Sequence, residues 1–230
     1  TGKLVCVDHE DAKPDILIGV SGGSDSMALL DIGVKAGLKI SVANVNYQLR
    51  NEESERDYKI VKEYCKINNL NFYYKKVKLD NLKNLQKKAR EIRYKYYNEI
   101  ISQENLDYII TGHHQNDDHE TFLLNTIKGS GIKGLKGIPE KNGIILRPAL
   151  QFTKSLLLEY VNHHKIKIGI DSSNLASKYE RNYLRNEVFN KISSKFPDFE
   201  KGFTNSIQFL KKDYLLLNEL VQKIINPQIE

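Results

Sequence analysis

The chain has 230 residues, of which 35 are Lys or Arg and 29 are Asp or Glu, leaving a formal net charge of +6. That length suits one α/β domain with a small appendage, and the charge fits either a polyanionic partner or a lysine-rich solvated surface. The two cysteines, Cys6 and Cys65, lie far apart without a C-x-x-C pair, which excludes a disulfide framework and a cysteine-ligated metal signature. No apolar run reaches the ~18 residues of a membrane span. We therefore expect a soluble, cytoplasmic protein with no membrane partner.

Residues 16–26 read I-L-I-G-V-S-G-G-S-D-S, an apolar run followed by a glycine-serine loop. The run predicts a strand buried on both faces of a parallel sheet, and the loop then opens a helix. Glycines let backbone N–H groups approach an anion and serine hydroxyls add donors, so this pattern predicts a phosphate site. The loop consists of Ser21, Gly22, Gly23, Ser24, Asp25 and Ser26.

Asp25 is unusual in such a loop, because a carboxylate repels a phosphate unless a cation lies between them. We therefore expect Asp25 to bind Mg²⁺. We also expect Ser24 or Asp25 to cap the helix that follows, so that its free N–H groups face the phosphate. A helix N-cap without any ligand is the alternative for this loop.

Further apolar runs alternate with helical patterns and lie at residues 39–46, 72–77, 107–112 and 143–146. Strand, helix and strand in this order form right-handed βαβ units. We therefore expect an α/β fold with a Rossmann-like open parallel sheet of about five strands and helices on both faces. A long helix is expected over residues 82–104, and an amphipathic helix from Phe196 to Ile225. We place the main domain at residues 1–190 and a helical extension at residues 191–230.

A second polar group follows the fourth predicted strand and reads G-H-H-Q-N-D-D-H-E-T over residues 112–121. Helical spacing puts Asp117 and Glu120 on one face, at the edge where open α/β sheets bind ligands. A zinc site is disfavoured, because no H-E-x-x-H is present and a helix start stabilises carboxylates in any case. Each residue alone predicts a structural role. Together with the first loop, Gly112, His114, Asp117 and Glu120 become site candidates.

Three pairs of basic residues are further candidates: Arg90 and Arg93, Lys133 and Lys136, and Arg181 and Arg185. The members of each arginine pair are three or four residues apart, so on a helix they share a face and can hold a phosphate. The two lysines lie among the four glycines of residues 129–137, a loop suited to closing over phosphates or an RNA backbone. A solvated surface is the alternative for the two arginine pairs.

The loop S-G-G-S-D-S resembles the PP-loop of the N-type ATP pyrophosphatases, S-G-G-x-D-S. Five further stretches resemble the tRNA(Ile)-lysidine synthetases: L-R at 49–50, A-R-x-x-R-Y at 89–94, H-x-x-D-x-x-E-T at 114–121, the glycine-rich segment at 129–137, and D-x-S-N with R-N-x-L-R within 171–185. Three positions depart from that family. Asn116 stands where aspartate is usual, Asp118 where glutamine is usual, and Tyr47 where a histidine is usual.

The resemblance implies a two-step reaction. ATP adenylates the C2 oxygen of the wobble cytidine in tRNA(Ile) with a CAU anticodon, and free L-lysine then displaces AMP. ATP and Mg²⁺ are the implied cofactors, with Asp25 as the metal ligand. Residues 1–190 are the implied catalytic domain, without the carboxyl-terminal tRNA-binding domains of many relatives.

The resemblance also assigns roles to individual residues. The implied catalytic residues are Asp25, His114, Asp117, Glu120, Arg181 and Arg185. The implied nucleotide-binding residues are Ser21, Gly22, Gly23, Ser24, Asp25, Ser26 and Gly112. The implied substrate-binding residues are Arg90, Arg93, Lys133, Lys136, Asp117 and Glu120.

Two other functions stay open. A tRNA 2-thiolation enzyme shares the PP-loop and the Gly-His-His opening, but the relatives we would compare use cysteine pairs that this chain lacks. A nucleotide-binding or RNA-binding module without catalysis is consistent with the departures at Asn116 and Asp118. A homodimer is left open as well.

Overall fold

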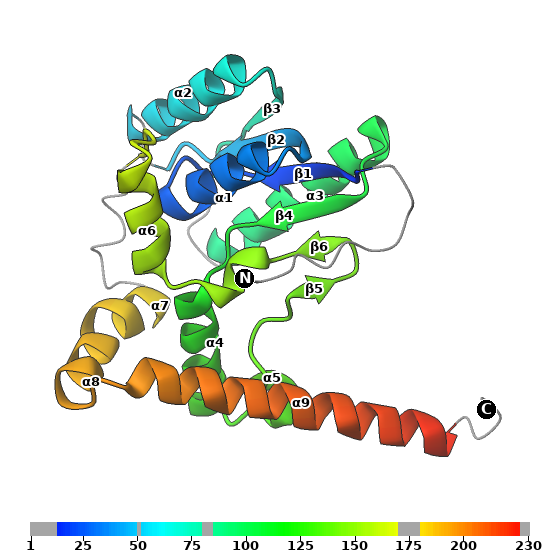
Figure 1. Cartoon of the computed structure of the whole chain (residues 1–230), viewed down its shortest axis with the longest axis vertical. Helices are drawn as coiled ribbons and strands as arrows, with labels where there is room; N and C mark the ends of the chain where they lie inside the picture. Colours follow the sequence, from blue (N-terminus) through cyan, green and yellow to red (C-terminus); the bar gives the residue numbers. More distant parts are fainter. Residues whose placement is uncertain (1–12, 50–51, 80–84, 170–179, 226–230) are drawn as a thin grey trace.

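The computed structural model describes residues 13–49, 52–79, 85–169 and 180–225. A six-stranded sheet in the order β3-β2-β1-β4-β6-β5 forms its centre (Figure 1). The strands are β1 (Asp15–Gly19), β2 (Lys39–Asn46), β3 (Asn71–Lys76), β4 (Tyr108–Thr111), β5 (Lys141–Asn142) and β6 (Ile145–Leu146). All neighbouring strands are parallel except β5, which pairs antiparallel with β6. The predicted α/β fold with a mostly parallel sheet is therefore confirmed.

The edge formed by β5 and β6 differs from the prediction. The strand expected over residues 143–146 begins only at Ile145, because Gly143 has a φ of 58° in the turn between β5 and β6. The additional strand β5 has two exposed polar residues. So short a polar strand carries no alternation of apolar and polar residues, and the sequence pattern could not reveal it.

Helices connect the strands and continue after the last one (Figure 1). The α-helices are α1 (Ser24–Lys35), α2 (Glu52–Ile67), α3 (Leu85–Glu104), α4 (Gln115–Ile127), α5 (Ile132–Leu135), α6 (Lys154–His163), α7 (Glu180–Tyr183), α8 (Phe189–Lys195) and α9 (Phe199–Ile225). They are joined by a 3₁₀ helix, η1 (Pro148–Gln151), and a π-helical turn, η3 (Leu184–Val188). Across these residues, no helix combines the length and the apolar composition that crossing a membrane requires.

Two expected helices start at other positions than predicted or outside the described residues. The helix expected from Phe196 begins instead at Phe199, because Phe196 precedes Pro197 and a residue before proline avoids helical conformation. The start of the helix expected at residue 82 lies outside the described residues. Arg50 and the D-x-S-N stretch at 171–174 lie outside them too.

Alternate residues of the central strands pack against helices on opposite faces of the sheet. On one face, Leu17 of β1 and Ile109 of β4 belong to a cluster with Tyr97 of α3. On the other face, α1, α2 and α6 cover the sheet, and Cys65 of α2 is buried among them. Helices therefore cover both faces, as predicted, and Cys65 is a core residue.

The helix α9 lies outside the sheet and runs past α4 and α5 (Figure 1). Its first half packs on the domain through the buried Ile207 and through Phe203, whose ring centroid lies 5.4 Å from that of Phe122 in α4. In its second half, apolar side chains such as Leu217 and Ile224 are exposed. One apolar stripe thus has a packed half and an exposed half.

Candidate active site

The loop between β1 and α1 has the geometry of an anion site. The helix α1 begins at Ser24, with Gly23 as its N-cap and no side-chain hydrogen bond at the cap. The prediction that Ser24 or Asp25 caps this helix is therefore wrong. Instead the Ser24 hydroxyl donates to Asp25 Oδ1 over 3.0 Å. The uncapped N–H groups of the first turn are the groups that an anion would meet.

Ser26 and two glycines shape this turn. Ser26 Oγ accepts from the N–H of Ser21 over 3.2 Å and donates to the carbonyl of Gly23 over 3.1 Å. Gly22 has a φ of 96°, and a Cβ there would lie only 3.0 Å from an atom of α2, so the position requires glycine. A Cβ on Gly112 would lie 3.4 Å from the nitrogen of Ser26. The end of β4 and the PP-loop therefore meet closely.

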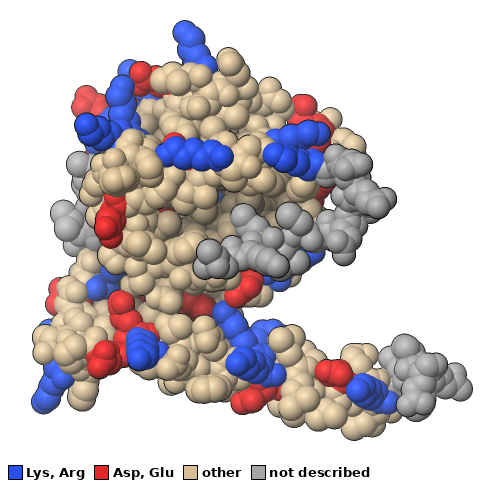
Figure 2. All heavy atoms as spheres, in the orientation of Figure 1, with Lys and Arg blue, Asp and Glu red and all other residues tan. Residues whose placement is uncertain are grey.

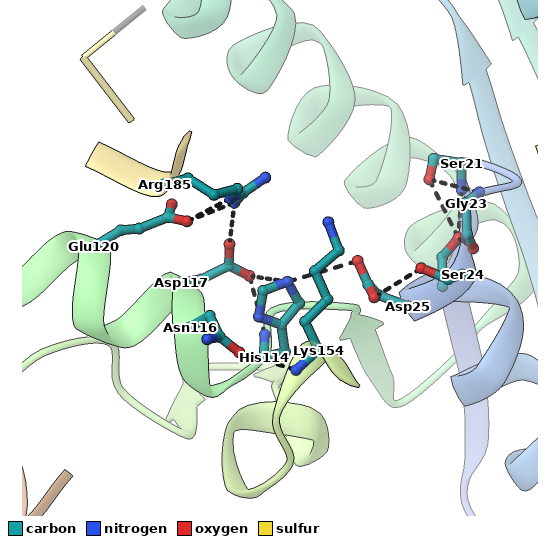
Figure 3. A network of polar contacts seen from close by, with 11 residues as sticks. Ser21, Gly23, Ser24, Asp25, His114, Asn116, Asp117, Glu120, Lys154 and Arg185 are labelled. Atoms are coloured by element: carbon teal, nitrogen blue, oxygen red, sulfur yellow. Dashed lines mark hydrogen bonds and ion pairs between the residues drawn. The ribbon is translucent and has the colours of Figure 1, made fainter. Parts of the chain in front are cut away.

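His114 connects the loop to α4. It lies immediately before the helix, and its side chain is only 3% exposed. Its Nε2 atom lies 3.6 Å from Asp25 Oδ2 and 3.6 Å from Asp117 Oδ2 (Figure 3). Burial lowers the pKa of His114 below its usual value, although both carboxylates oppose this shift. The imidazole is therefore neutral near pH 7 and can accept a proton.

The positive charge of Arg185 offsets the negative charges of Asp117 and Glu120 in α4. A terminal nitrogen of Arg185, in η3, lies 2.7 Å from Glu120 Oε1 and 3.4 Å from Asp117 Oδ1 (Figure 3). Glu120 is 1% exposed, and burial raises the pKa of its carboxyl although the charge of Arg185 opposes this shift. Asp117 and Glu120 share a helix face, as the spacing predicts.

Arg181 and Arg185, the arginine pair predicted to hold a phosphate, both contact α4. Arg181, in α7, donates to the hydroxyl of Thr121 over 3.1 Å. The Arg185 side chain is 27% exposed and holds the buried Glu120, so a freely solvated arginine is the wrong description of this position. These guanidinium groups bind α4 itself, which leaves fewer donors for a ligand than the sequence suggested.

Asn116 and Asp118, the two residues of α4 that differ from the usual family residues, both contact α9. Asn116 donates to Glu200 Oε1 over 3.0 Å, and its amide oxygen accepts from the N–H of Lys154 over 2.9 Å. Asp118 is buried, and its Oδ2 lies 3.1 Å from the ammonium of Lys211. An aspartate at position 116 would face Glu200, so the asparagine suits its neighbour. In this chain both residues fasten α9 to the domain.

Arg90 and Arg93 lie on α3, with their guanidinium groups 4.9 Å and 5.7 Å from the ring centroid of Tyr94. Burial lowers the pKa of Arg90, and repulsion from Arg93, Arg147 and Arg181 adds to this shift. Such mutual repulsion shows that these arginines gather in one region. The structure thus brings the predicted arginines of α3 together with cations from two later segments.

Lys133 and Lys136 lie beside α9. The ammonium of Lys136 is 3.6 Å from the ring centroid of Tyr214, and Lys133 also acts electrostatically on that phenol. A cation over an aromatic face is attracted by the ring quadrupole. These lysines therefore connect the glycine-rich segment to α9, an arrangement that the sequence spacing did not reveal.

Arg147 and Lys154 are near the site but are not among the residues proposed from the sequence. Arg147 is buried, and its Nη1 donates to the carbonyl of Pro139 over 2.7 Å. Burial lowers the pKa of His113 to about 4, and the charge of Arg147 contributes to this shift against the influence of Asp117. One sequence signal for Arg147 was its position directly after a predicted strand.

The donor set at the loop fits Mg²⁺. Within the described ranges, no group of three or more His, Cys, Asp or Glu side chains is arranged to hold a metal ion. Mg²⁺ needs no such group, because it keeps several waters and binds through one or two carboxylates together with substrate phosphates. Asp25, whose side chain is 25% exposed, is a carboxylate that lies beside the free N–H groups of α1.

The sequence pattern of a known family spans this site. The PP-loop domain family matches residues 3–192, which include both the loop at residues 21–26 and the polar start of α4. The chain therefore belongs to the PP-loop domain family.

Individual relatives are more specific. The chain is 34% identical over 226 residues to a tRNA(Ile)-lysidine synthase of Bacillus licheniformis, covering 93% of this chain and 48% of the relative. It is 33% identical over 190 residues to a tRNA(Ile)-lysidine synthase of Chlorobaculum tepidum, covering 79% of this chain and 57% of the relative. The chain thus spans about half the length of the curated relatives it matches.

A solved structure has the same fold. The U34-tRNA thiolase from Methanococcus maripaludis, determined with its 4Fe-4S cluster, superposes with a TM-score of 0.68 at 16% sequence identity. The superposition covers 88% of this chain and 74% of that one. At this identity the likeness concerns the fold alone.

Proposed function

We propose that this chain carries the catalytic domain of a tRNA(Ile)-lysidine synthetase, which uses ATP to join free lysine to C2 of the wobble cytidine in tRNA(Ile) with a CAU anticodon. One observation carries the proposal: the buried His114 lies within 3.6 Å of both Asp25 and Asp117. The neutral imidazole of His114 thus contacts both the PP-loop, which is suited to bind phosphate, and Asp117, a carboxylate suited to bind an amine. The likeness to curated lysidine synthases supports the same reaction.

In the first step the C2 oxygen of the cytidine attacks the α-phosphorus of ATP, and the bond to the leaving pyrophosphate breaks. The free N–H groups of α1 and the hydroxyls of the PP-loop hold the phosphate oxygens, because they are fixed donors that need not reorganise. Asp25 is the residue that would hold Mg²⁺, which offsets negative charge on the phosphates. The exposed edge of the Asp25 side chain leaves room for this role.

In the second step the amine of lysine attacks C2, and AMP leaves with the former C2 oxygen. The amine arrives as an ammonium ion and must lose a proton. We assign this proton to His114 Nε2, which is neutral and lies 3.6 Å from Asp117. Asp117, with a 15% exposed side chain, contacts Arg185 only over 3.4 Å and can receive an incoming ammonium, whereas the buried Glu120 holds Arg185 over 2.7 Å. Asp117 is therefore the lysine ligand of this proposal and Glu120 a positioning residue.

The tRNA contact is a further part of the proposal. On the face drawn in Figure 2, Lys and Arg side chains form separate groups among acidic residues rather than one continuous patch. Binding is therefore expected from particular clusters, and Arg90 and Arg93 with Lys133 and Lys136 are the residues we assign to the RNA backbone. Phosphate contacts release counterions, so tRNA affinity should fall steeply with salt.

The deciding experiment follows lysine itself. The purified chain is given a tRNA(Ile) transcript with a CAU anticodon, ATP, Mg²⁺ and labelled lysine, and both pyrophosphate release and lysine incorporation are measured. We expect lysine in the tRNA, and none in a transcript whose wobble cytidine is replaced by uridine. His114→Asn should abolish incorporation, while the same change at the exposed His163 should not alter it.

Other outcomes point to other functions. Adenylated tRNA that never takes up lysine would overturn the ligase proposal and favour 2-thiolation. Cys65 itself is unsuited to sulfur transfer, because burial raises the pKa of its thiol to about 12 and it lies in the core. Binding of ATP and tRNA without any pyrophosphate release would indicate a binding module.

Three broader assignments belong to the same proposal. We place the enzyme in the cytoplasm, and we divide the chain into a catalytic domain at residues 1–190 and a helical extension at residues 191–230. We also propose a homodimer, supported by the exposed apolar half of α9, where Leu217 and Ile224 lack cover from the described part of the chain. Sedimentation at rising protein concentration tests the dimer, and a monomer throughout would contradict it.

A further inference from the structure

Lys154 occupies a junction between three parts of the site. It is the first residue of α6, and the hydroxyl of Thr153 caps this helix by accepting from the N–H of Leu156 over 3.2 Å. The backbone N–H of Lys154 donates to the amide oxygen of Asn116 over 2.9 Å. Asn116 is adjacent to Asp117, so the start of α6 is fixed against the start of α4.

The side chain of Lys154 extends into the site. In Figure 3 it points from the start of α6 toward the part of the site where His114, Asp25 and Arg185 lie. The electrostatics of the site reflect this position, because the charge of Lys154 acts on the imidazole of His114 and disfavours its protonation. The lysine is therefore electrostatically part of the site and not a distant surface residue.

The ammonium of Lys154 differs from the other cations beside it. Arg185 is bound to Glu120 and Arg181 to Thr121. Among residues 13–49, 52–79, 85–169 and 180–225, the Lys154 ammonium has no ion pair or hydrogen bond. A half-buried cation held in this position without a protein anion is suited to an anion that arrives with a ligand.

We propose that Lys154 binds a phosphate group of the nucleotide, on the side of the site opposite the PP-loop. This inference rests on the proposed use of ATP. On that side the phosphates would otherwise meet the carboxylate of Asp117, which repels them. Lysine is a compact charge on a flexible stem, so it can follow a phosphate through the reaction where a fixed guanidinium could not.

Direct binding measurements test the inference without any turnover. Isothermal titration in the presence of Mg²⁺ compares a non-hydrolysable ATP analogue, pyrophosphate, AMP and adenosine as probes. We expect Lys154→Met to weaken binding of the ATP analogue at least tenfold and to leave adenosine unaffected. Lys154→Arg should retain most of the affinity, because it keeps the charge. Lys66→Met, the same change on the exposed surface of α2, is the matched control.

The two smaller probes locate the phosphate. Weaker binding of AMP alone would assign Lys154 to the α-phosphate, and weaker binding of pyrophosphate alone would assign it to the leaving group. Both results support the inference. Equal binding of the ATP analogue by the wild-type protein and by Lys154→Met would overturn it while leaving ATP use intact. A wild-type protein that binds none of the phosphate probes would overturn the proposed function and this inference together.

Discussion

The two halves of the site differ in where their polar groups find partners. In the PP-loop, the side chains of Ser24 and Ser26 bond to groups no more than five residues away, and Asp25 stays partly exposed. In α4, the buried Glu120 and Asp118 are paired with Arg185 and Lys211, which lie 65 and 93 residues further along the chain. The loop is thus prepared for a ligand, whereas the buried carboxylates of α4 are already held by the rest of the protein.

The strongest test of the ligand-binding half is Asp25→Ala. We expect pyrophosphate release to fall by about a hundredfold or more, because the change removes the proposed metal ligand beside the phosphates. The melting temperature should stay within about 2 °C, because no buried packing atom is lost. Asp213→Ala, the same change at an exposed position of α9, is the matched control. Near-normal turnover of Asp25→Asn at limiting Mg²⁺ would contradict the assignment.

The corresponding test of α4 is Arg185→Ala, measured by urea unfolding at pH 8. We expect a loss of about 3 kcal/mol in the free energy of unfolding, because the change leaves a buried carboxylate without its cation. The raised pKa of Glu120 means that it takes up a proton readily, so the loss should be smaller at pH 5 than at pH 8.

Glu120→Gln in the same chain is the control for Arg185→Ala. The double variant should recover most of the lost stability, because the amide carries no charge. A loss below about 0.5 kcal/mol for Arg185→Ala alone would place this arginine among ordinary surface residues. The contrast between the two halves of the site would then disappear.

A third test uses pH and His113. Burial lowers the pKa of this histidine from 6.5 to about 4, so between these values the unfolded chain binds a proton that the folded chain does not. The free energy of unfolding should therefore fall as pH decreases from about 6.5 to about 4. His113→Gln should reduce this slope, whereas His163→Gln on the exposed end of α6 should keep it. If the free energy of unfolding changed equally with pH in the wild-type protein and both variants, the lowered pKa of His113 would be contradicted.

The smallest effect is expected for Asn116→Asp, which restores the residue usual in the lysidine synthetases. A carboxylate at this position would face Glu200, so we expect a loss of about 1 kcal/mol in unfolding experiments. Glu200→Gln in the same chain should relieve the repulsion. A stabilised single variant would show that the asparagine does not serve the contact with α9.

Much of the fold and part of the site were predictable, for physical reasons that differ between residues. The buried strands and the PP-loop depend on short stretches, so their patterns are visible locally: β1 and the loop at residues 21–26 are both continuous in sequence. The pairing of Arg185 with Glu120 and of Asp118 with Lys211 depends on how distant helices pack. No spacing rule connects such positions, and β5 was too short for any pattern.

The two edge strands of the sheet affect how readily copies of the chain aggregate. One end is β3, which bears Lys75 and Lys76, and the other is β5, which consists of Lys141 and Asn142. Charged lysines and very short strands discourage an edge from adding strands of another molecule. Copies of this chain should therefore not join sheet to sheet, and contacts between them are left to helical surfaces such as the exposed half of α9.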